Sequence, residues 1–256
     1  MSCDLFNLDG RVALVTGGSK GLGKAMARGF AEAGADVMIS SRSENELKAT
    51  AAEVGEGLDV KVEWMVADMG DREASDQLAA ETISRLGKVD IVVNNAGSNT
   101  PQPIDQIVDE DWDRIVELNL TSCMRLTRAV VPGMIERKWG RVIHISSVLG
   151  LGSKPARNVY SATKAGLIGM AKASALDLGP HNITVNCIAP GPILTDLPMS
   201  LLDDEEKKQF SNMTALDRWG KPRELAGPAL FLASEAGSYT TGTTILVDGG
   251  AYARAL

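Results

Sequence analysis

A tyrosine and a lysine stand four residues apart in the stretch "VYSATKAGLIGMAKASALDL" (residues 159–178). In a helix, Tyr160 and Lys164 lie side by side on one face, where the lysine ammonium stabilises a phenolate. A free tyrosine gives up its proton only near pH ~10, so proton transfer at neutral pH requires such a neighbour. For an isolated pair, the alternative is a packed phenol beside a solvent-seeking amine. The pair is a candidate acid/base centre whose interpretation depends on the rest of the chain.

A glycine-rich turn opens the stretch "TGGSKGLGKAMARGFAEAGA" (residues 16–35), directly after the first predicted strand. Gly17, Gly21 and Gly23 have the spacing G-x-x-x-G-x-G, which differs from the G-x-G-x-x-G fingerprint. Glycines permit a tight turn and close backbone approach, and the free N–H groups of a helix start attract pyrophosphate. A plain strand-to-helix connection is the alternative, but the position after the first strand favours a dinucleotide.

The second predicted strand ends in "ISSRSENE", where an NAD-specific site usually carries an acidic residue for the ribose 2′-hydroxyl. Ser41 and Arg42 occupy that place instead. A carboxylate repels a 2′-phosphate, whereas Arg42 pairs with it and Lys20 supplies a second positive charge. NADP(H) is favoured over NAD(H), the alternative being that both residues are ordinary surface cations.

The elements that must position these residues are short apolar, β-branched runs separated by helical patterns. The runs are "RVALVTG", "ADVMIS", "VKVEWMVAD", "VDIVVNNAG", "GRVIHISS", "NITVNCIAPG" and "TTILVDGG". Such alternation predicts a doubly wound α/β fold, in which a mostly parallel sheet of seven strands carries helices on both faces. No repeat, linker or shift in composition divides the chain, so residues 1–256 are predicted to form one domain.

Local sequence patterns predict several boundaries within this fold. "SENE" at residues 43–46 has the spacing of a capping box, and a helix in residues 70–87 is predicted to stop at Gly87. The segment 190–220 contains prolines and an acidic cluster, and reads as an excursion beyond the sixth strand. Because ligands bind outside the carboxyl ends of strands in open α/β sheets, residues 192–215 are the candidate substrate lid.

Composition excludes several classes of function. The 256 residues carry a net charge of −7 without any basic run, which argues against nucleic-acid or anionic-membrane binding and favours small-molecule partners. Three widely spaced cysteines without a CxxC argue against a disulfide framework and a metal site. The acidic N-terminus lacks an apolar h-region, and no apolar run approaches the ~18 residues of a membrane span. A cytoplasmic location is expected.

Polar and small residues follow the next three predicted strands. "VAD" ends at Asp68, which is placed to accept from an adenine amine, "NNAG" occupies residues 94–97, and "HISS" closes the fifth strand with Ser146 and Ser147. These ends face the same crevice as the glycine turn. His144 in an apolar strand and His181 in a turn are both expected to be structural.

At this point the sequence resembles a short-chain dehydrogenase/reductase along essentially its whole length. The matching motifs are "TGGSKGLG", "NNAG", Asn119 in "ELNLTS", Ser147, "YSATK" and "APGPILTD", in this order and at these spacings. The resemblance implies a Rossmann-like domain and a catalytic tetrad of Asn119, Ser147, Tyr160 and Lys164. Ser147 is preferred to Ser146 because it stands thirteen residues before Tyr160, as in the family.

The resemblance also implies the role of each residue in the interconversion of a ketone and an alcohol. Tyr160 exchanges the proton of the substrate oxygen, Ser147 donates a hydrogen bond to that oxygen, and Lys164 binds the nicotinamide ribose. Asn119 holds a water that links Lys164 to solvent, or its amide caps a helix kink that seats this water. The implied cofactor contacts are Gly17, Ser19, Lys20, Gly21, Leu22, Gly23, Ser41, Arg42, Asp68, Met69, Asn95, Ala96, Gly97, Tyr160, Lys164, Pro190, Gly191, Ile193 and Thr195.

The helix that holds Tyr160 and Lys164 is apolar on more than one stripe, from Ala165 to Leu178. A sheet can cover only one face of a helix, so a partner subunit is expected to cover another. The resemblance implies a homotetramer built on this helix and the preceding one.

The substrate remains open between two members of the family. Gluconate 5-dehydrogenase-like members share the opening "DLFNLDGRVALVTGGSKGLGKAMA", and a small hydroxy or keto substrate such as a sugar acid or polyol is favoured. The stretch after Ser147, "VLGLGSKPARN", is mainly aliphatic, which argues against a charged sugar acid, and Lys154 and Arg157 are its only evident carboxylate partners. A 3-oxoacyl-[acyl-carrier-protein] reductase is the alternative. It is weakened by Leu176 and Asp177 where a basic residue would meet the acidic carrier, although Arg137 and Lys138 remain. A non-catalytic dinucleotide-sensing protein is the alternative of another class.

Overall fold

The predicted apolar runs form the strands of one sheet in the computed structural model, which describes residues 4–195 and 203–253. The strands are β1 (Val12–Thr16), β2 (Asp36–Ser41), β3 (Val62–Val66), β4 (Ile91–Asn94), β5 (Gly140–Ile145), β6 (Ile183–Pro190) and β7 (Thr244–Val247). Their order is β3-β2-β1-β4-β5-β6-β7, and every pair is parallel rather than most of them. The reversal of order between β1 and β4 is the switch point at which open α/β sheets bind ligands.

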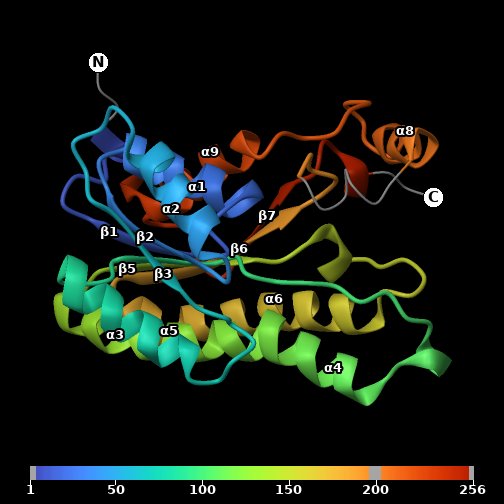
Figure 1. Cartoon of the computed structure of the whole chain (residues 1–256), viewed down its shortest axis with the longest axis horizontal. Coiled ribbons are helices and arrows are strands. Elements are labelled where there is room, and N and C mark those ends of the chain that lie inside the picture. The colour runs from blue at the N-terminus through green and yellow to red at the C-terminus, as the bar shows by residue number, and fades with distance from the viewer. Residues whose placement is uncertain (1–3, 196–202, 254–256) are drawn as a thin grey trace.

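Two layers of helices cover the sheet (Figure 1). One layer contains α1 (Gly21–Glu32), α2 (Glu44–Gly55) and α9 (Arg223–Ala233), and the other contains α3 (Ala74–Leu86), α4 (Asp109–Val116), α5 (Ser122–Arg137) and α6 (Asn158–Leu178). Each layer shares a buried apolar cluster with the sheet. The doubly wound α/β prediction is confirmed, because continuous apolar strands need cover on both faces.

Shorter turns connect these elements. Three-residue 3-10 turns span Asp4–Phe6, Ile104–Gln106, Val148–Gly150, Gly179–His181, Glu235–Gly237 and Ala251–Ala253, and a π turn spans Glu117–Thr121 between α4 and α5. Within the described ranges, no helix combines the length and apolarity needed to cross a membrane. The same residues include no group of three or more histidine, cysteine or acidic side chains arranged to hold a metal.

The predicted helix ends are found, with one difference. α3 stops at Gly87, whose φ of 85° is left-handed. At the start of α2, Ser43 Oγ accepts from the N–H of Glu46, as a capping box requires. The return bond is not made, because the Glu46 carboxylate instead accepts from Ser19 Oγ at 3.0 Å and Lys20 Nζ at 3.4 Å. A side chain expected to serve its own helix therefore faces the glycine turn.

The segment after β6 leaves the sheet, as predicted. α8 (Asp204–Asn212) lies at one end of the molecule, away from both helix layers (Figure 1). Residues 196–202 of the predicted lid lie outside the described residues. The segment's base is held by main-chain bonds from Leu194 N to Gly220 O at 2.8 Å and from Gly220 N to Pro192 O at 2.9 Å.

An aromatic stack joins elements at the amino ends of β1 and β5. The Trp139 ring lies between two guanidinium groups, with Arg11 at 3.6 Å and Arg141 at 4.2 Å from its centroid. Its indole N–H donates to Glu235 at 2.8 Å. Arg141 is fully buried, and burial lowers the pKa of its guanidinium.

Candidate active site

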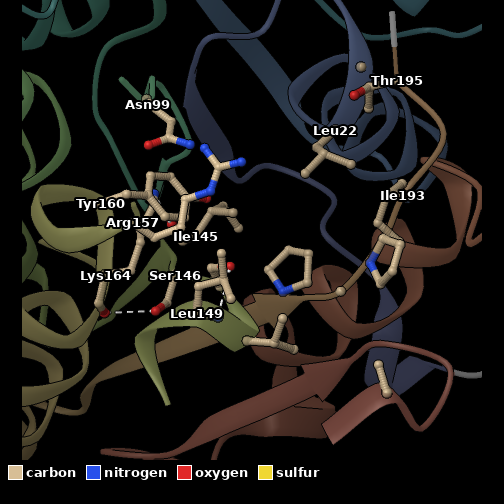
Figure 2. A pocket seen from close by; sticks show the side chains of 18 of the residues that line it. Leu22, Asn99, Ile145, Ser146, Leu149, Arg157, Tyr160, Lys164, Ile193 and Thr195 are labelled. Atoms are coloured by element: carbon tan, nitrogen blue, oxygen red, sulfur yellow. Dashed lines mark hydrogen bonds between the residues drawn. The ribbon is translucent and has the colours of Figure 1, made fainter. Parts of the chain in front are cut away.

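A cavity of about 510 Å³ lies at the carboxyl ends of the central strands. Its wall combines the glycine turn before α1, the ends of β4 and β5, the start of α6 and the segment after β6. Figure 2 shows residues from these elements around the cavity. The parallel register brings all of these strand ends to one edge, which is why residues far apart in the sequence meet here.

Tyr160 and Lys164 lie together as predicted. Lys164 Nζ is 5.6 Å from the centroid of the Tyr160 ring, and both side chains line the cavity. Lys164 is only 4% exposed, and its ammonium donates to the carbonyl of Ile145 at 2.7 Å. The Lys164 ammonium is therefore held between the end of β5 and the Tyr160 ring.

The two serines at the end of β5 have different tasks. Ser146 Oγ donates to the main-chain carbonyl of Lys164 at 2.8 Å, which ties α6 to the sheet (Figure 2). Ser147 Oγ accepts from the N–H of Leu149 at 3.1 Å and makes no donor bond to any described residue. Its hydroxyl proton is therefore available to a ligand, as expected for the serine preferred in the sequence.

Asn119 lies in the π turn, fully buried. Its side-chain oxygen accepts from Ser98 N at 2.9 Å, and its amide donates to Ser98 O at 2.9 Å and to Thr163 Oγ1 at 3.2 Å. The side chain therefore ties the π turn to the loop after β4 and to α6, and it does not cap the turn itself. Because the side chain of Asn119 is engaged in these bonds, a water bound by this residue would have to donate to its main-chain carbonyl. That carbonyl also accepts a hydrogen bond from the Cys123 thiol at 3.4 Å.

The glycine turn is packed too closely for side chains at two of its glycines. A Cβ on Gly23 would collide with the carbonyl of Gly17, and one on Gly17 would lie 2.9 Å from Asn95 Nδ2. Gly17 also has a φ of 63°, which favours glycine. The Asn95 amide donates to the carbonyls of Thr16 and Gly17 at 2.9 and 3.1 Å, which couples the turn to the end of β4. This cradle fits the pyrophosphate of a dinucleotide.

Most predicted cofactor contacts form one surface. The cavity wall includes Lys20, Gly21, Leu22, Asn95, Gly97, Tyr160, Lys164, Pro190, Gly191, Ile193 and Thr195. The wall does not include Gly17, Ser19, Gly23, Ser41, Arg42, Asp68, Met69 or Ala96. The Met69 side chain is buried in the apolar cluster that includes residues of α3, so a cofactor contact at Met69 would use its main chain.

The place predicted for a 2′-phosphate holds charges of both signs. Arg42 is exposed and has no ion pair within the described ranges, whereas Lys20 is paired with Glu46. Glu46 was not among the predicted site residues. The capping-box pattern accounted for it locally, and only the tertiary structure brings it to Ser19 and Lys20.

The wall facing the glycine turn contains residues that motif spacing did not reveal. These residues are Asn99, Phe210, Met213, Trp219 and Ala251. Phe210 and Trp219 pack with their ring centroids 5.3 Å apart. Lys154 and Arg157, noted in the sequence as carboxylate partners, line the same wall.

Titratable groups behind the site are held neutral. His144 is fully buried beside Asn94, and burial together with the charge of Lys164 lowers its pKa to about 4. Burial raises the pKa of the Cys187 thiol to about 12 and also raises that of Cys123. These groups are structural at neutral pH, in keeping with the expectation for His144.

Comparison with known proteins adds the family. A family model described as enoyl-(acyl carrier protein) reductase matches residues 17–252. A 3-oxoacyl-[acyl-carrier-protein] reductase of Thermotoga maritima is 38% identical over 243 residues, covering 95% of this chain and 98% of the relative.

Two solved structures are similar over nearly the full length. One is a candidate NAD(P)-dependent gluconate 5-dehydrogenase from Beutenbergia cavernae, with NADP bound at low occupancy. Its TM-score is 0.92 at 34% identity, and the match covers 98% of this chain and 100% of that one. The other is a 3-oxoacyl (acyl-carrier-protein) reductase from Agrobacterium tumefaciens with NADP bound, with a TM-score of 0.91, 33% identity and 97% coverage of both chains. The chain belongs to the short-chain dehydrogenase/reductase family, and is an oxidoreductase of alcohol and keto groups that uses a dinucleotide cofactor.

Proposed function

We propose that this chain interconverts a ketone and a secondary alcohol with NADP(H), and that Tyr160 is its general acid and base. The observation that carries the proposal is the buried Lys164 ammonium, 5.6 Å from the Tyr160 ring centroid, in a cavity that also borders the glycine turn. A phenol, an ammonium and a free hydroxyl donor in one cavity are the groups that carbonyl reduction needs.

The residues of the tetrad divide the work of proton transfer. Bound nicotinamide supplies or takes up the hydride. In the reductive direction Tyr160 gives its proton to the substrate oxygen, and Ser147 donates a hydrogen bond to the same oxygen. Lys164 stabilises the phenolate that remains and holds the ribose hydroxyls. A water on the main-chain carbonyl of Asn119 returns the proton from solvent.

The preference for NADP(H) rests on Arg42 and Lys20, and on the absence of an acid at positions 41 and 42. The two NADP-bound family structures support it. Arg42→Asp should weaken NADPH binding by about a hundredfold while NADH binding changes by less than about threefold, because only NADPH carries the 2′-phosphate. Equal losses for both nucleotides in a fluorescence titration would contradict this assignment.

The substrate that we propose is a small hydroxy or keto compound such as a sugar acid or polyol. The similarity to the Beutenbergia protein supports this class, and Lys154 and Arg157 supply carboxylate partners in the cavity wall. Reduction of 3-oxoacyl-[acyl-carrier-protein] is the second candidate, favoured by the Thermotoga and Agrobacterium relatives.

One assay separates these candidates. NADPH and NADH oxidation by the purified protein is measured against 5-ketogluconate, simple ketones and a 3-oxoacyl thioester. Turnover confined to keto sugars and small ketones supports the proposal, and turnover confined to the thioester assigns the second candidate. Binding of NADPH without turnover of any compound would favour a sensing role.

We also propose a homotetramer in the cytoplasm. On α6, small residues at positions 162, 165, 169 and 173 are exposed, and Leu176 is 81% exposed, so this stripe lacks cover within one chain. A second copy would bury it. Elution at the mass of one chain in gel filtration contradicts the tetramer.

The free thiols of Cys123 and Cys187 fit a reducing compartment.

A further inference from the structure

We propose that the cavity binds its substrate through a carboxylate, held between Lys154 and Arg157, so that the substrate is a small keto or hydroxy acid. This inference rests on the proposed reaction at Tyr160 and narrows the class of molecule that reacts there. Four features of the described residues support it: unpaired charge, a fixed backbone, an unsatisfied amide oxygen and an otherwise apolar wall.

The first feature is positive charge without a counterion. Lys154 and Arg157 line the cavity, and neither takes part in any ion pair among residues 4–195 and 203–253. Burial and the charge of Arg157 lower the pKa of Lys154, which means that the ammonium is held where its charge costs free energy. A bound anion would remove that cost.

The second feature is the way in which Arg157 is presented. Arg157 directly precedes α6, and the preceding Ala156 has a φ of 60°, which is strained for a residue with a side chain. The strained turn is held by a bond from Gln102 N to Ala156 O at 3.0 Å and one from Asn158 Nδ2 to Gln102 O at 3.1 Å. Figure 2 shows the Arg157 guanidinium beside Tyr160, on the cavity side of this turn.

The third feature is a buried acceptor without a donor. The side-chain oxygen of Asn99 is buried and has no hydrogen-bond partner. Asn99 and Arg157 line the same cavity, and in the view of Figure 2 the side-chain nitrogen of Asn99 is on the Arg157 side and its oxygen on the other. Buried polar atoms are nearly always satisfied by protein, water or ligand, so this oxygen is an acceptor that a ligand can use. A hydroxyl group close to the substrate carboxylate would supply the donor.

The fourth feature is the apolar character of the remaining wall. The Lys154 ammonium lies 4.6 Å from the centroid of the Phe210 ring, and Leu149 and Met213 line the same space. Lys154 and Arg157 are therefore the charged groups next to this apolar part of the wall. The planar fork of a guanidinium matches the two oxygens of a carboxylate, and because it also pairs with phosphate, the test includes a phosphate ligand.

The test compares acids with neutral partners of the same carbon skeleton. Calorimetric titrations with the NADPH-saturated protein use gluconate against glucitol, 3-hydroxybutyrate against 1,3-butanediol, and lactate against 1,2-propanediol. Because NADPH and an alcohol are both in the reduced state, no turnover interferes. Arg157→Gln and Lys154→Gln are compared with Lys48→Gln. Lys48 is on α2, outside the cavity, and its ammonium lies 5.5 Å from the centroid of the Trp64 ring.

We expect at least one acid to bind about tenfold or more tightly than its diol. Arg157→Gln and Lys154→Gln should each weaken binding of that acid by about tenfold and change binding of its neutral partner by less than about twofold. Lys48→Gln should change neither affinity. If no acid binds more tightly than its partner, or if the variants weaken acid and diol equally, the carboxylate site is wrong.

Two further measurements keep this inference separate from the proposed function. NADPH oxidation with butanone but no preference for acids would leave the proposed reaction standing and overturn the carboxylate site. A preference for acids without oxidation of NADPH by any ketone would do the reverse. Binding of pantetheine 4′-phosphate that exceeds binding of pantetheine and depends on Arg157 would assign the cations to a phosphate and also overturn the carboxylate.

Discussion

The two walls of the cavity satisfy their polar groups in opposite ways. The cofactor wall is the side formed by the glycine turn and the ends of β4 and β5. On this wall, Asn95 and Ser146 bond to neighbouring main-chain carbonyls, and Lys20 forms an ion pair with Glu46. The substrate wall is the opposite side, which includes Asn99, Lys154, Arg157, Phe210 and Trp219. On this wall, among the described residues, Lys154 and Arg157 have no ion pair and the side-chain oxygen of Asn99 has no donor. A wall that is complete by itself positions a ligand shared by a whole family. A wall that is incomplete is completed by the specific molecule it recognises.

The sharpest test of this contrast is Tyr160, where the two walls meet. Tyr160→Phe removes the proton donor and should lower turnover by about a thousandfold, with NADPH affinity unchanged within about twofold. Stopped-flow NADPH oxidation and a fluorescence titration measure the two quantities. The matched control is Tyr252→Phe, which removes a hydroxyl that bonds to the Leu151 carbonyl at 3.2 Å and should keep the rate. A Tyr160→Phe protein that retains its rate would refute the proposed mechanism.

Acid should weaken the interior behind the cofactor wall. His144 has a folded-state pKa of about 4 against an ordinary value of 6.5, so the unfolded chain takes up the proton first as pH falls. Stability is therefore lost between these two values, by about 2 kcal/mol at pH 5. Urea unfolding at pH 7 and pH 5 measures this loss, which His144→Gln should reduce and His181→Gln should not. Equal pH dependence in all three proteins would speak against it.

Space on the cofactor wall should matter more than space elsewhere. Gly23→Ala places a methyl group against the Gly17 carbonyl, which distorts the cradle and should weaken NADPH binding by about tenfold. Gly227→Ala in α9 meets nothing within 4 Å and serves as the matched control. The contrast between the walls would lose its basis if both variants bound NADPH like the parent protein.

The smallest expected effect concerns the charge that Glu46 brings to Lys20. Glu46→Gln frees Lys20 for a 2′-phosphate and should tighten NADPH binding by about threefold while NADH binding stays constant, because exposed pairs contribute little. The matched control is Glu53→Gln, because Glu53 lies on α2 like Glu46 and pairs with Lys24 on α1. Tighter binding in the Glu53 variant alone would show that the relevant carboxylate had been misidentified.

Sequence reasoning predicted the fold, and placed the proposed cofactor contacts near one another, for one reason. Strand ends, the glycine turn and the Tyr160–Lys164 spacing are local patterns, and a parallel sheet brings strand ends to one edge whatever the details of packing. The prediction of mostly parallel strands was even cautious, since every pair is parallel. The burial of Met69 was missed, because one position in a strand-end loop does not reveal which face it packs against.

The substrate wall was less predictable for the opposite reason. Phe210 and Trp219 come from a segment without periodicity, and Asn99 follows a motif whose spacing ends before it. Lys154 and Arg157 were noticed as charges, but their lack of counterions is a tertiary property. Glu46 matched a local capping pattern, and the structure gives its carboxylate a long-range partner instead.

The Trp139 stack gives the molecule a built-in spectroscopic reference. Trp139 lies between Arg11 and Arg141 at the amino ends of the strands, whereas Trp219 lines the cavity. Emission from Trp139 should follow unfolding and ignore ligands, and emission from Trp219 should respond to both. With Trp64 and Trp112 replaced by phenylalanine, variants that keep only Trp139 or only Trp219 separate the occupancy of the cavity from the integrity of the chain around it.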